Sequence, residues 1–335
     1  MKRVRLIVSV GCPSGIGPEV SVVAAAEARG VDVLLVGDEG AIRRAATARG
    51  VAHERLVRVA EARFARGKIA ILQPSTSLAA RDRKPGAPSA AAGAAQLEWI
   101  DAATDLVRQG IGDALVTGPV SKEAIAGSGA PGAAAFRGHT EHLQARLHAR
   151  EVVMAFAGEG LVTALATTHL SLADVPQKLD RAAVARATFW LASLVHELGV
   201  RRPRIAVAAL NPHAGEGGLL GTEEVRVLTP GIRDAKRRLV KARIPVELSG
   251  PVPAETAFRL AARGTFDGVV AMYHDQATIP MKLLSFGEAV NVSLGLPIIR
   301  TSVDHGTAYD RAKRFDADAS GMSAAMELAR RLVGA

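Results

Sequence analysis

The chain has 335 residues, of which 48% are hydrophobic and 22% charged, so its composition can fill a core and excludes an intrinsically disordered protein. The single cysteine, Cys12, excludes an intrachain disulfide and a Cys-rich zinc module and favours a reduced, cytoplasmic protein. The net charge of +9 suits nucleic acid or an anionic small substrate, but scattered arginines and an aromatic content of only 4% argue against a nucleic-acid surface.

The first apolar segment, residues 5–11, predicts a strand rather than a secretory signal. Its apolar run is short, and a turn containing Gly and Pro follows at once. Farther along, charged residues or histidines interrupt every long apolar segment before it reaches the roughly 18 residues of a membrane span. We therefore expect neither a signal peptide nor a transmembrane helix.

Short β-branched runs alternate along the chain with Ala-rich stretches of helical periodicity. The predicted strands are 5–11, 31–37, 68–73, 112–119, 161–168, 204–212, 245–251 and 267–274. The predicted helices are 18–30, 39–50, 91–110, 181–199, 228–243 and 254–264. This alternation predicts an α/β fold with mostly parallel strands. Ligands of such folds bind at the carboxyl ends of strands, so the turns that follow strands are the places to look for a site.

Two glycine-rich motifs differ in their setting. GCPSGIGPE, at 11–19, follows the first strand and opens a helix, with Pro18 suited to the first turn. Its backbone N–H groups could hold an anion, or it is simply a tight turn between strand and helix. GSGAPG, at 127–132, matches GxGxxG but contains Pro131 and has no strand directly before it, so we expect a loop rather than a dinucleotide site.

Three of the nine histidines, His169, His213 and His274, stand where predicted strands end. Taken singly, each is more simply explained as an ordinary loop or core residue. Side chains at the ends of different strands can nevertheless converge at one edge of a sheet. Three neutral imidazoles with open positions would suit a catalytic divalent metal.

Further polar clusters are Thr117–Lys122 and Gly138–Glu141. Near the C-terminus, Lys282 and Arg300 punctuate an otherwise apolar stretch, together with Asn291. Such cations could clamp a carboxylate or a phosphate, with arginine binding in bidentate fashion. The alternative for each cation is an ordinary surface ion pair.

These segments together resemble the 4-hydroxythreonine-4-phosphate dehydrogenase family of vitamin B6 biosynthesis. The resemblance runs from about residue 7 to residue 312 and rests on GCPSGIGPE, KPGAPSAAAG, VTGPVSK, RGHTEHL, ATTHL, LNPHAGEGGLLGTEE, GPVPAETAF, AMYHDQATIPMK and VNVSLGLPIIRTSVDHGTA. It implies two α/β/α domains like those of isocitrate and isopropylmalate dehydrogenases, with a cleft between them, in a homodimer. We expect residues 1–125 plus 275–335 to form the first domain. Residues 126–274 would form the second, which carries much of the dimer interface.

The resemblance also implies a reaction. Enzymes of this family oxidise 4-phosphooxy-L-threonine at its 3-hydroxyl with NAD or NADP and a divalent metal (zinc, magnesium or cobalt). The product then loses CO2 to give 3-amino-2-oxopropyl phosphate, a precursor of pyridoxal 5′-phosphate.

Carried over by motif, the family's metal ligands fall on His169, His213 and His274, the third coming from the partner subunit. Its substrate-binding residues fall on His139, Thr140, Lys282, Asn291 and Arg300. We further assign catalytic roles to Lys122 and Asp275, and cofactor contacts to Asp304, His305, Gly306 and Thr307.

Two positions depart from the family pattern. Cys12 stands where Asp is usual, and Ser121 where His is common before the lysine. Both departures bear on the substrate, so the same chemistry on threonate 4-phosphate, erythronate 4-phosphate or a cis-diol is an alternative. A more remote alternative is a tri-His metal lyase or hydrolase without a nicotinamide step, and another is a non-catalytic binder.

Overall fold

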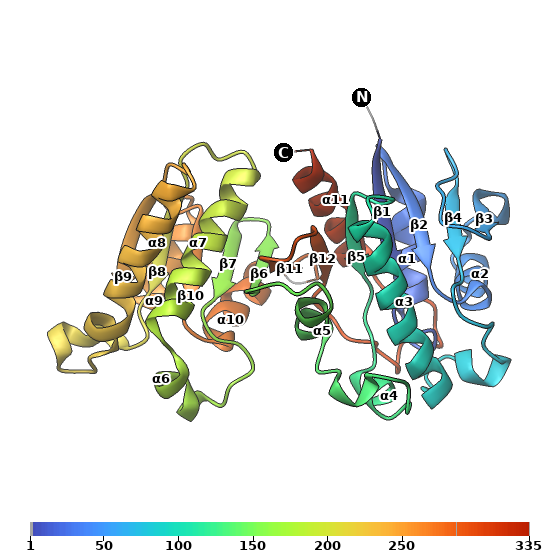
Figure 1. Ribbon diagram of the computed structural model, residues 1–335, viewed down its shortest axis with the longest axis horizontal. Coiled ribbons are helices and arrows are strands. Elements are labelled where there is room, and N and C mark those ends of the chain that lie inside the picture. The colour runs from blue at the N-terminus through green and yellow to red at the C-terminus, as the bar shows by residue number, and fades with distance from the viewer. Residues whose placement is uncertain (1–2, 286, 335) are drawn as a thin grey trace. The chain divides into compact units, whose positions relative to one another are not determined.

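The computed structural model describes residues 3–285 and 287–334. The chain forms two compact units. Unit 1 combines the chain up to Ala149 with Leu296–Gly334, and unit 2 is Arg150–Gly295. Each unit is built around its own strands, with helices on both sides (Figure 1).

The strands of unit 1 are all parallel. In their order across the unit they are β3 (Leu56–Val59), β4 (Ile69–Leu72), β2 (Val31–Val36), β1 (Val4–Ser9), β5 (Ala114–Thr117) and β12 (Arg300–Val303). In the register of the three strands β1, β5 and β12, Thr117 lies beside both Ser9 and Ser302. The turns that follow these strands therefore emerge together at one edge.

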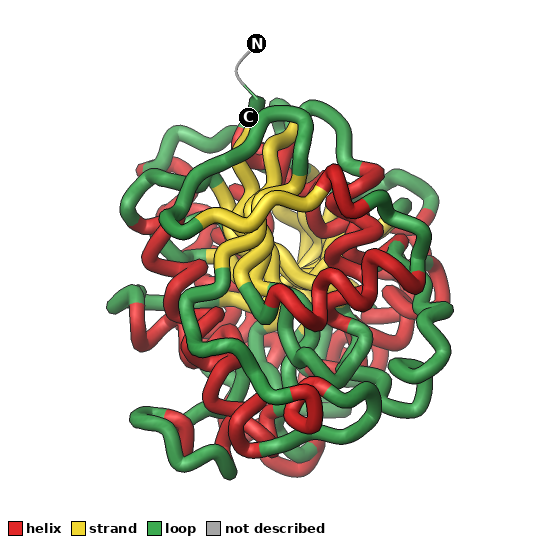
Figure 2. Tube along the Cα trace, turned by 90° about the vertical axis from the view of Figure 1, so that its right-hand side faces the viewer, coloured by secondary structure: helices red, strands yellow, loops and turns green. Residues whose placement is uncertain are grey.

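The helices of unit 1 are α1 (Gly17–Glu27), α2 (Glu39–Ala48), α3 (Ala90–Arg108), α4 (Lys122–Ala126), α5 (His139–Arg146) and α11 (Ser320–Val333). Helix α1 packs with α2 and α11, whereas α3 packs with α4 and against β1 and β5. The strands thus lie between helices, as Figure 2 shows.

Unit 2 contains parallel and antiparallel strands. Their order is β11 (Val290–Leu294), β6 (Val153–Gly158), β7 (Leu161–Leu165), β10 (Gly268–Ala271), β8 (Arg204–Ala208) and β9 (Glu247–Val252). Strand β6 runs antiparallel to both β7 and β11, and the remaining pairs are parallel. The carboxyl ends of β7, β10 and β8 therefore share one edge.

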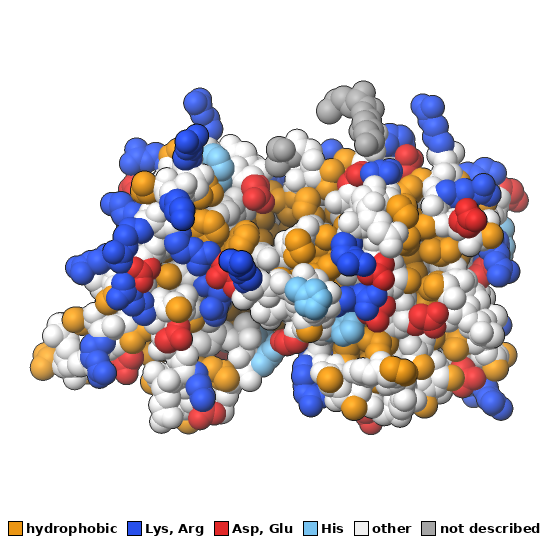
Figure 3. Space-filling view, viewed as in Figure 1, with side chains coloured by type: hydrophobic (Ala, Val, Ile, Leu, Met, Phe, Trp, Pro, Cys, Tyr) orange, Lys and Arg blue, Asp and Glu red, His pale blue; other side chains and the backbone are white. Residues whose placement is uncertain are grey.

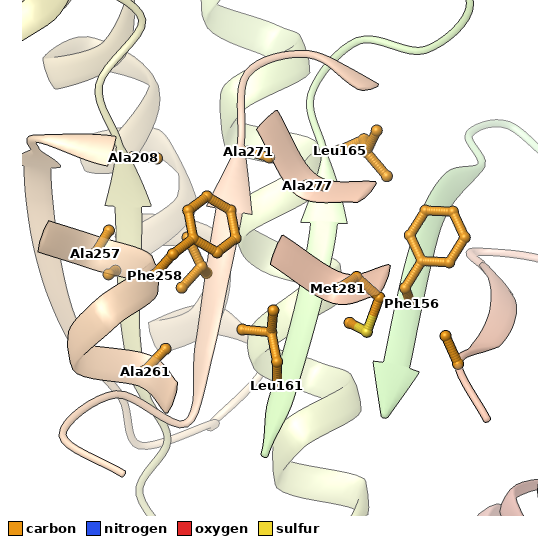
Figure 4. Packing of buried hydrophobic residues seen from close by; sticks show 13 residues of the cluster. Phe156, Leu161, Leu165, Ala208, Ala257, Phe258, Ala261, Ala271, Ala277 and Met281 are labelled. Atoms are coloured by element: carbon orange, nitrogen blue, oxygen red, sulfur yellow. The ribbon is translucent and has the colours of Figure 1, made fainter. Parts of the chain in front are cut away.

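The helices of unit 2 are α6 (Val175–Lys178), α7 (Arg181–Glu197), α8 (Thr229–Lys241), α9 (Ala254–Ala262) and α10 (His274–Leu284). Helices α9 and α10 cover an apolar cluster on the strands, in which Phe156, Phe258 and Met281 are the largest members (Figure 4). Small alanines fill the positions between these side chains, which lets the helices approach the strands closely.

The predicted α/β fold is confirmed, and each predicted strand and helix overlaps an observed one. Strand 5–11 is β1, and Pro18 lies in the first turn of α1 as expected. Residues 127–132 form the predicted loop, which lies between α4 and the short 3-10 helix Ala133–Ala135. The strands that the sequence did not reveal are β3, β6, β11 and β12. Among the described residues no helix is long and apolar enough to cross a membrane.

The chain passes from unit 1 to unit 2 between residues 149 and 150, and returns between residues 295 and 296. Both boundaries lie later in the chain than the expected 125/126 and 274/275. Helix α5 belongs to unit 1 because His142 and Arg146 bond Asp101 and Asp105 of α3. Helix α10 belongs to unit 2 because it packs on β7 and β10.

Gly93 allows the close approach of α3 to α4. A Cβ atom at this position would lie 1.9 Å from the carbonyl oxygen of Ala124. We expect Gly93→Ala to destabilise the protein by at least about 1–3 kcal/mol, because the backbone must move. Urea unfolding measures this, with Gly334→Ala as control, since its new Cβ would come no closer than 3.6 Å to another atom. Equal stability of the two variants would contradict the packing described.

Candidate active site

The turns after β1, β5 and β12 are tied together by backbone hydrogen bonds. The N–H of Cys12 donates to the carbonyl of Pro119 over 2.8 Å, and that of Ile16 to the carbonyl of Thr307 over 3.0 Å. GCPSGIGPE is therefore a tight turn whose ends are fixed by its two neighbours. This edge of unit 1 gathers several predicted site residues.

Arg300 is the buried cation of this edge, with only 3% of its surface exposed. Its Nη2 donates to Oγ1 of Thr117 over 2.7 Å. Burial lowers the pKa of its guanidinium to about 10, while the nearby Glu141 acts in the opposite direction. The group stays charged at neutral pH, so unit 1 holds a positive charge largely removed from water.

His139 begins α5 beside this cation. Burial lowers its pKa well below the usual value, and the positive charges of Arg300 and Lys122 add to the effect. The ring is therefore neutral at pH 7. Its Nε2 is buried and makes no hydrogen bond to any described residue.

The start of α5 is also rich in hydrogen-bond donors. Gly138 is its N-cap and offers no side-chain cap, and Thr140 in the first turn is buried. Uncapped N–H groups at a helix N-terminus favour an anion. The structure thus brings together the predicted substrate residues His139, Thr140 and Arg300.

Lys122 stands at the first turn of α4, and its side chain is exposed. Ser121, one of the two departures, is the N-cap of this helix, and its Oγ accepts from the N–H of Ala124 over 3.1 Å. The N–H of Ser121 in turn donates to the side chain of Gln96. Serine is a favoured N-cap, so this departure has a structural reason.

Cys12, the other departure, is fully buried, and its Sγ lies 3.3 Å from the hydroxyl of Tyr309. Burial raises the pKa of the thiol. Burial and the thiol also raise the pKa of Tyr309 to about 12, although its hydrogen bonds to Ser121 and Thr307 act against this. Both departures therefore meet at Tyr309, which the sequence did not single out.

The four predicted cofactor residues follow β12. Thr307 is bound to the first turn as described above. The ring of His305 lies near the carbonyl of Gly306, and its Nε2 is buried with no hydrogen bond among the described residues. Asp304 directly follows the strand.

In unit 2, His169 and His274 lie side by side, with ring centroids 5.7 Å apart. Thr167 places the first of them, because its N–H and hydroxyl both donate to the carbonyl of Met272 at the end of β10. His274 is the first residue of α10, and its Nδ1 lies 2.7 Å from Oδ1 of Asp275. When Nδ1 of a histidine donates a hydrogen bond to a carboxylate, Nε2 is the nitrogen that can bind a metal.

His213 is exposed in a turn at the end of β8, called η5 (Pro212–Gly218). Five consecutive residues, His213–Gly217, have positive φ angles between 45° and 79°. His213, Ala214 and Glu216 carry side chains, and the left-handed conformation costs such residues roughly 1–2 kcal/mol each. The surrounding contacts must therefore hold this turn.

The donor set fits a divalent metal, because two imidazoles lie together and a carboxylate orients one of them. In the part of the chain that the structure describes, no three His, Cys, Asp or Glu side chains of one chain come together to hold an ion. The structure thus pairs His169 with His274 but does not bring His213 to them. Lys282 lies in the last turn of α10, and Asn291 lies in β11.

The sequence missed three residues that shape these edges: Gln276, Glu224 and Tyr309. Gln276 accepts from the N–H of Met272 and donates to the carbonyl of Ala209, so it ties β10 to β8. Both Gln276 and Glu224 lie inside motifs of the family, but nothing in the spacing of those motifs reveals what they contact.

The chain matches the family described as "Pyridoxal phosphate biosynthetic protein PdxA" over residues 30–329. It is 42% identical to the 4-hydroxythreonine-4-phosphate dehydrogenase of Desulfosudis oleivorans, covering 96% of this chain and 94% of that one. It is 38% identical to the D-threonate 4-phosphate dehydrogenase of Salmonella typhimurium, covering 99% and 100%. Among solved structures, a 4-hydroxythreonine-4-phosphate dehydrogenase from Klebsiella pneumoniae has a TM-score of 0.81 at 36% identity, covering 99% of each chain.

Proposed function

The chain belongs to the pyridoxal phosphate biosynthetic protein PdxA family, and from this premise we propose that it is a 4-hydroxythreonine-4-phosphate dehydrogenase. It would oxidise the 3-hydroxyl of 4-phosphooxy-L-threonine and release CO2, giving 3-amino-2-oxopropyl phosphate for pyridoxal 5′-phosphate biosynthesis. The names of the relatives and their near-complete coverage of the chain support this reaction. NAD or NADP would accept the hydride.

The observation that carries the proposal is the buried cation Arg300 beside the neutral His139. A buried guanidinium favours an anionic partner. The phosphate or carboxylate of the substrate supplies such a charge, held also by Thr140 and the N–H groups at the start of α5. We propose Lys282 and Asn291 of unit 2 as further substrate contacts, Lys122 as a proton-transfer group, and Asp304–Thr307 as the cofactor segment.

We propose that His169, His213 and His274 hold one divalent ion, of zinc, magnesium or cobalt. Such an ion would favour loss of the 3-hydroxyl proton and accept electron density as CO2 leaves. Asp275 would contribute by orienting the ring of His274 through Nδ1.

A homodimer would complete this site. The segments that carry the three histidines expose large apolar side chains, among them Leu172, Leu219 (85% exposed) and Leu283 (80% exposed). Exposed apolar groups of this size favour an interface between subunits, here carried by unit 2. We propose that this dimer is cytoplasmic. We also propose that it has no nucleic-acid role, since Lys and Arg are interspersed with Asp and Glu on the face in Figure 3.

Mixing inactive variants tests which histidine comes from the partner. If His274 does, mixed His169→Ala and His274→Ala subunits form one intact site per heterodimer and regain about a quarter of wild-type activity. The pairing of these rings within one chain favours His213 instead, and then the mixture of His169→Ala with His213→Ala regains activity. If neither mixture regains activity although native mass spectrometry detects heterodimers, a site shared between subunits is contradicted.

A second candidate substrate is D-threonate 4-phosphate, which the 38% identical relative is named for. A cis-diol is a third, because a structure 30% identical, with a TM-score of 0.68, is described as a terephthalate 1,2-cis-dihydrodiol dehydrogenase. Erythronate 4-phosphate carries a carboxylate and a phosphate, as the first two candidates do.

A substrate panel separates these functions. Each compound is supplied with NAD or NADP, with and without chelator, and absorbance at the reduced-nicotinamide band is followed. We expect turnover to be fastest with 4-phosphooxy-L-threonine, lost on chelation and restored by metal. Preference for the threonate would select the second candidate, and no nicotinamide reduction with any compound would contradict a dehydrogenase.

A further inference from the structure

The turn that carries His213 needs a support, because its left-handed residues include three with side chains. Glu224 provides one. It is the first residue of a π-helical segment, η6 (Glu224–Leu228), and only 4% of its surface is exposed.

The carboxylate of Glu224 binds the start of the turn. Its Oε1 accepts from the N–H groups of Leu210, over 3.0 Å, and Asn211, over 2.8 Å. Its Oε2 accepts from the side-chain amide of Asn211 over 3.0 Å. These are charge-assisted bonds to a buried group, which makes them stronger than ordinary ones.

The same carboxylate also lies against the middle of the turn. A Cβ atom on Gly215 would come within 2.8 Å of Oε2, so the carboxylate packs directly against this residue. His213 therefore stands between two points, Asn211 and Gly215, that one carboxylate contacts.

We propose that Glu224 is the positioning residue of His213: it fixes the turn so that the imidazole is presented to the metal. The inference rests on the proposed metal-binding role of His213. Glu224 itself binds no metal, because its two oxygens already face the turn. A glutamine would keep the size but bring an NH2 group against the N–H and amide donors, so it would release one end of the turn.

Glu223 provides a matched control. It is adjacent in sequence and also acidic, and it accepts from the side-chain amide of Asn211 over 2.8 Å. Its bonds to the backbone are to residues 222 and 223, away from the start of the turn.

The experiment compares Glu224→Gln, Glu223→Gln and His213→Ala in the full-length protein. Co2+ is titrated and its visible absorption, which reports ligand geometry, gives the affinity. Hydrogen exchange of a peptide covering residues 210–217 is measured without metal. We expect Glu224→Gln to weaken Co2+ binding by about 10- to 100-fold and to speed exchange at Leu210 and Asn211, and Glu223→Gln to leave both near wild type.

Wild-type affinity and exchange in Glu224→Gln would overturn the inference, as would equal effects of the two glutamine variants. If His213→Ala binds Co2+ normally, the metal site itself is wrong; if it loses Co2+ while Glu224→Gln does not, only the role of Glu224 fails. Should Glu224→Gln not fold, Glu224→Asp tests the same contact, because it keeps the charge but withdraws it from the donors, and the same weakening is expected.

Discussion

Replacement of His169, His213 or His274 by alanine is expected to abolish turnover while leaving the protein folded. Loss of one of three ligands should weaken metal binding by more than the roughly 10- to 100-fold typical of an outer-sphere contact. His169 and His213 are exposed and His274 is partly exposed, so each replacement should change the free energy of unfolding by no more than about 1 kcal/mol. Activity is measured after chelation and metal return, and metal content by elemental analysis.

His148 is the matched control for these variants. It is exposed and has a φ of 51°, the same as that of His213, but it lies in unit 1 and in none of the site clusters. His148→Ala should keep both metal and activity. Near-normal activity of all three site variants after metal return would show that the histidines are not the ligands.

The sequence predicted these histidines because they follow strands, and the carboxyl ends of parallel strands meet at one edge. The strand periodicity of β7, β8 and β10 is plain, so the turns after them could be located. The sequence could not predict which of the three imidazole rings would lie together. The closeness of His169 and His274 depends on the bonds of Thr167 to Met272, which no periodicity reveals.

The role of Tyr309 shows a second limit of sequence reasoning. Its contact with Cys12 joins residues 297 positions apart. That contact requires the turns after β1 and β12 to emerge at the same edge, beside the turn after β5. Strand β12 was not predicted, because its four residues RTSV are short and lack the alternation of a half-exposed strand. From the sequence alone, Cys12 and Ser121 bear on the substrate, and the structure adds that Cys12 packs against Tyr309 and that Ser121 caps α4.

Glu223 and Glu224 illustrate the same limit at short range. Two adjacent acids are equivalent in sequence, but only Glu224 is buried and accepts from the N–H groups of Leu210 and Asn211. The irregular path of η5 decides between them. An irregular turn has neither helix nor strand periodicity in its sequence, so its internal contacts are known only from the structure.

Replacement of Arg300 by methionine is expected to lower kcat/KM for a phosphorylated hydroxy acid by about 10- to 150-fold. A charge-assisted hydrogen bond contributes roughly 1.5–3 kcal/mol, and about 1.4 kcal/mol corresponds to tenfold. The effect on a neutral diol should be slight, because no anion is bound. Steady-state kinetics with both substrate types measure the difference.

The pH dependence supplies an independent check on the same residue. Arg300 is charged below its pKa of about 10 and loses the charge above it. The kcat/KM for the anionic substrate should therefore fall as the pH rises through about 10, and Arg300→Met should lack that fall. His139 is neutral at all pH values above its strongly lowered pKa, so it contributes no step near neutrality.

Two controls separate substrate binding from a structural role of Arg300. Arg137→Met removes an exposed arginine that precedes α5 and donates to the carbonyl of Ala134, and it should leave the kinetics unchanged. Thr117→Val removes the hydroxyl that Arg300 binds but keeps the positive charge of Arg300. Its kcat/KM should therefore fall less than that of Arg300→Met. Equal losses of Arg300→Met on charged and neutral substrates would mean that the guanidinium supports the fold or the cofactor. The assignment of an anionic substrate would then lose its main support.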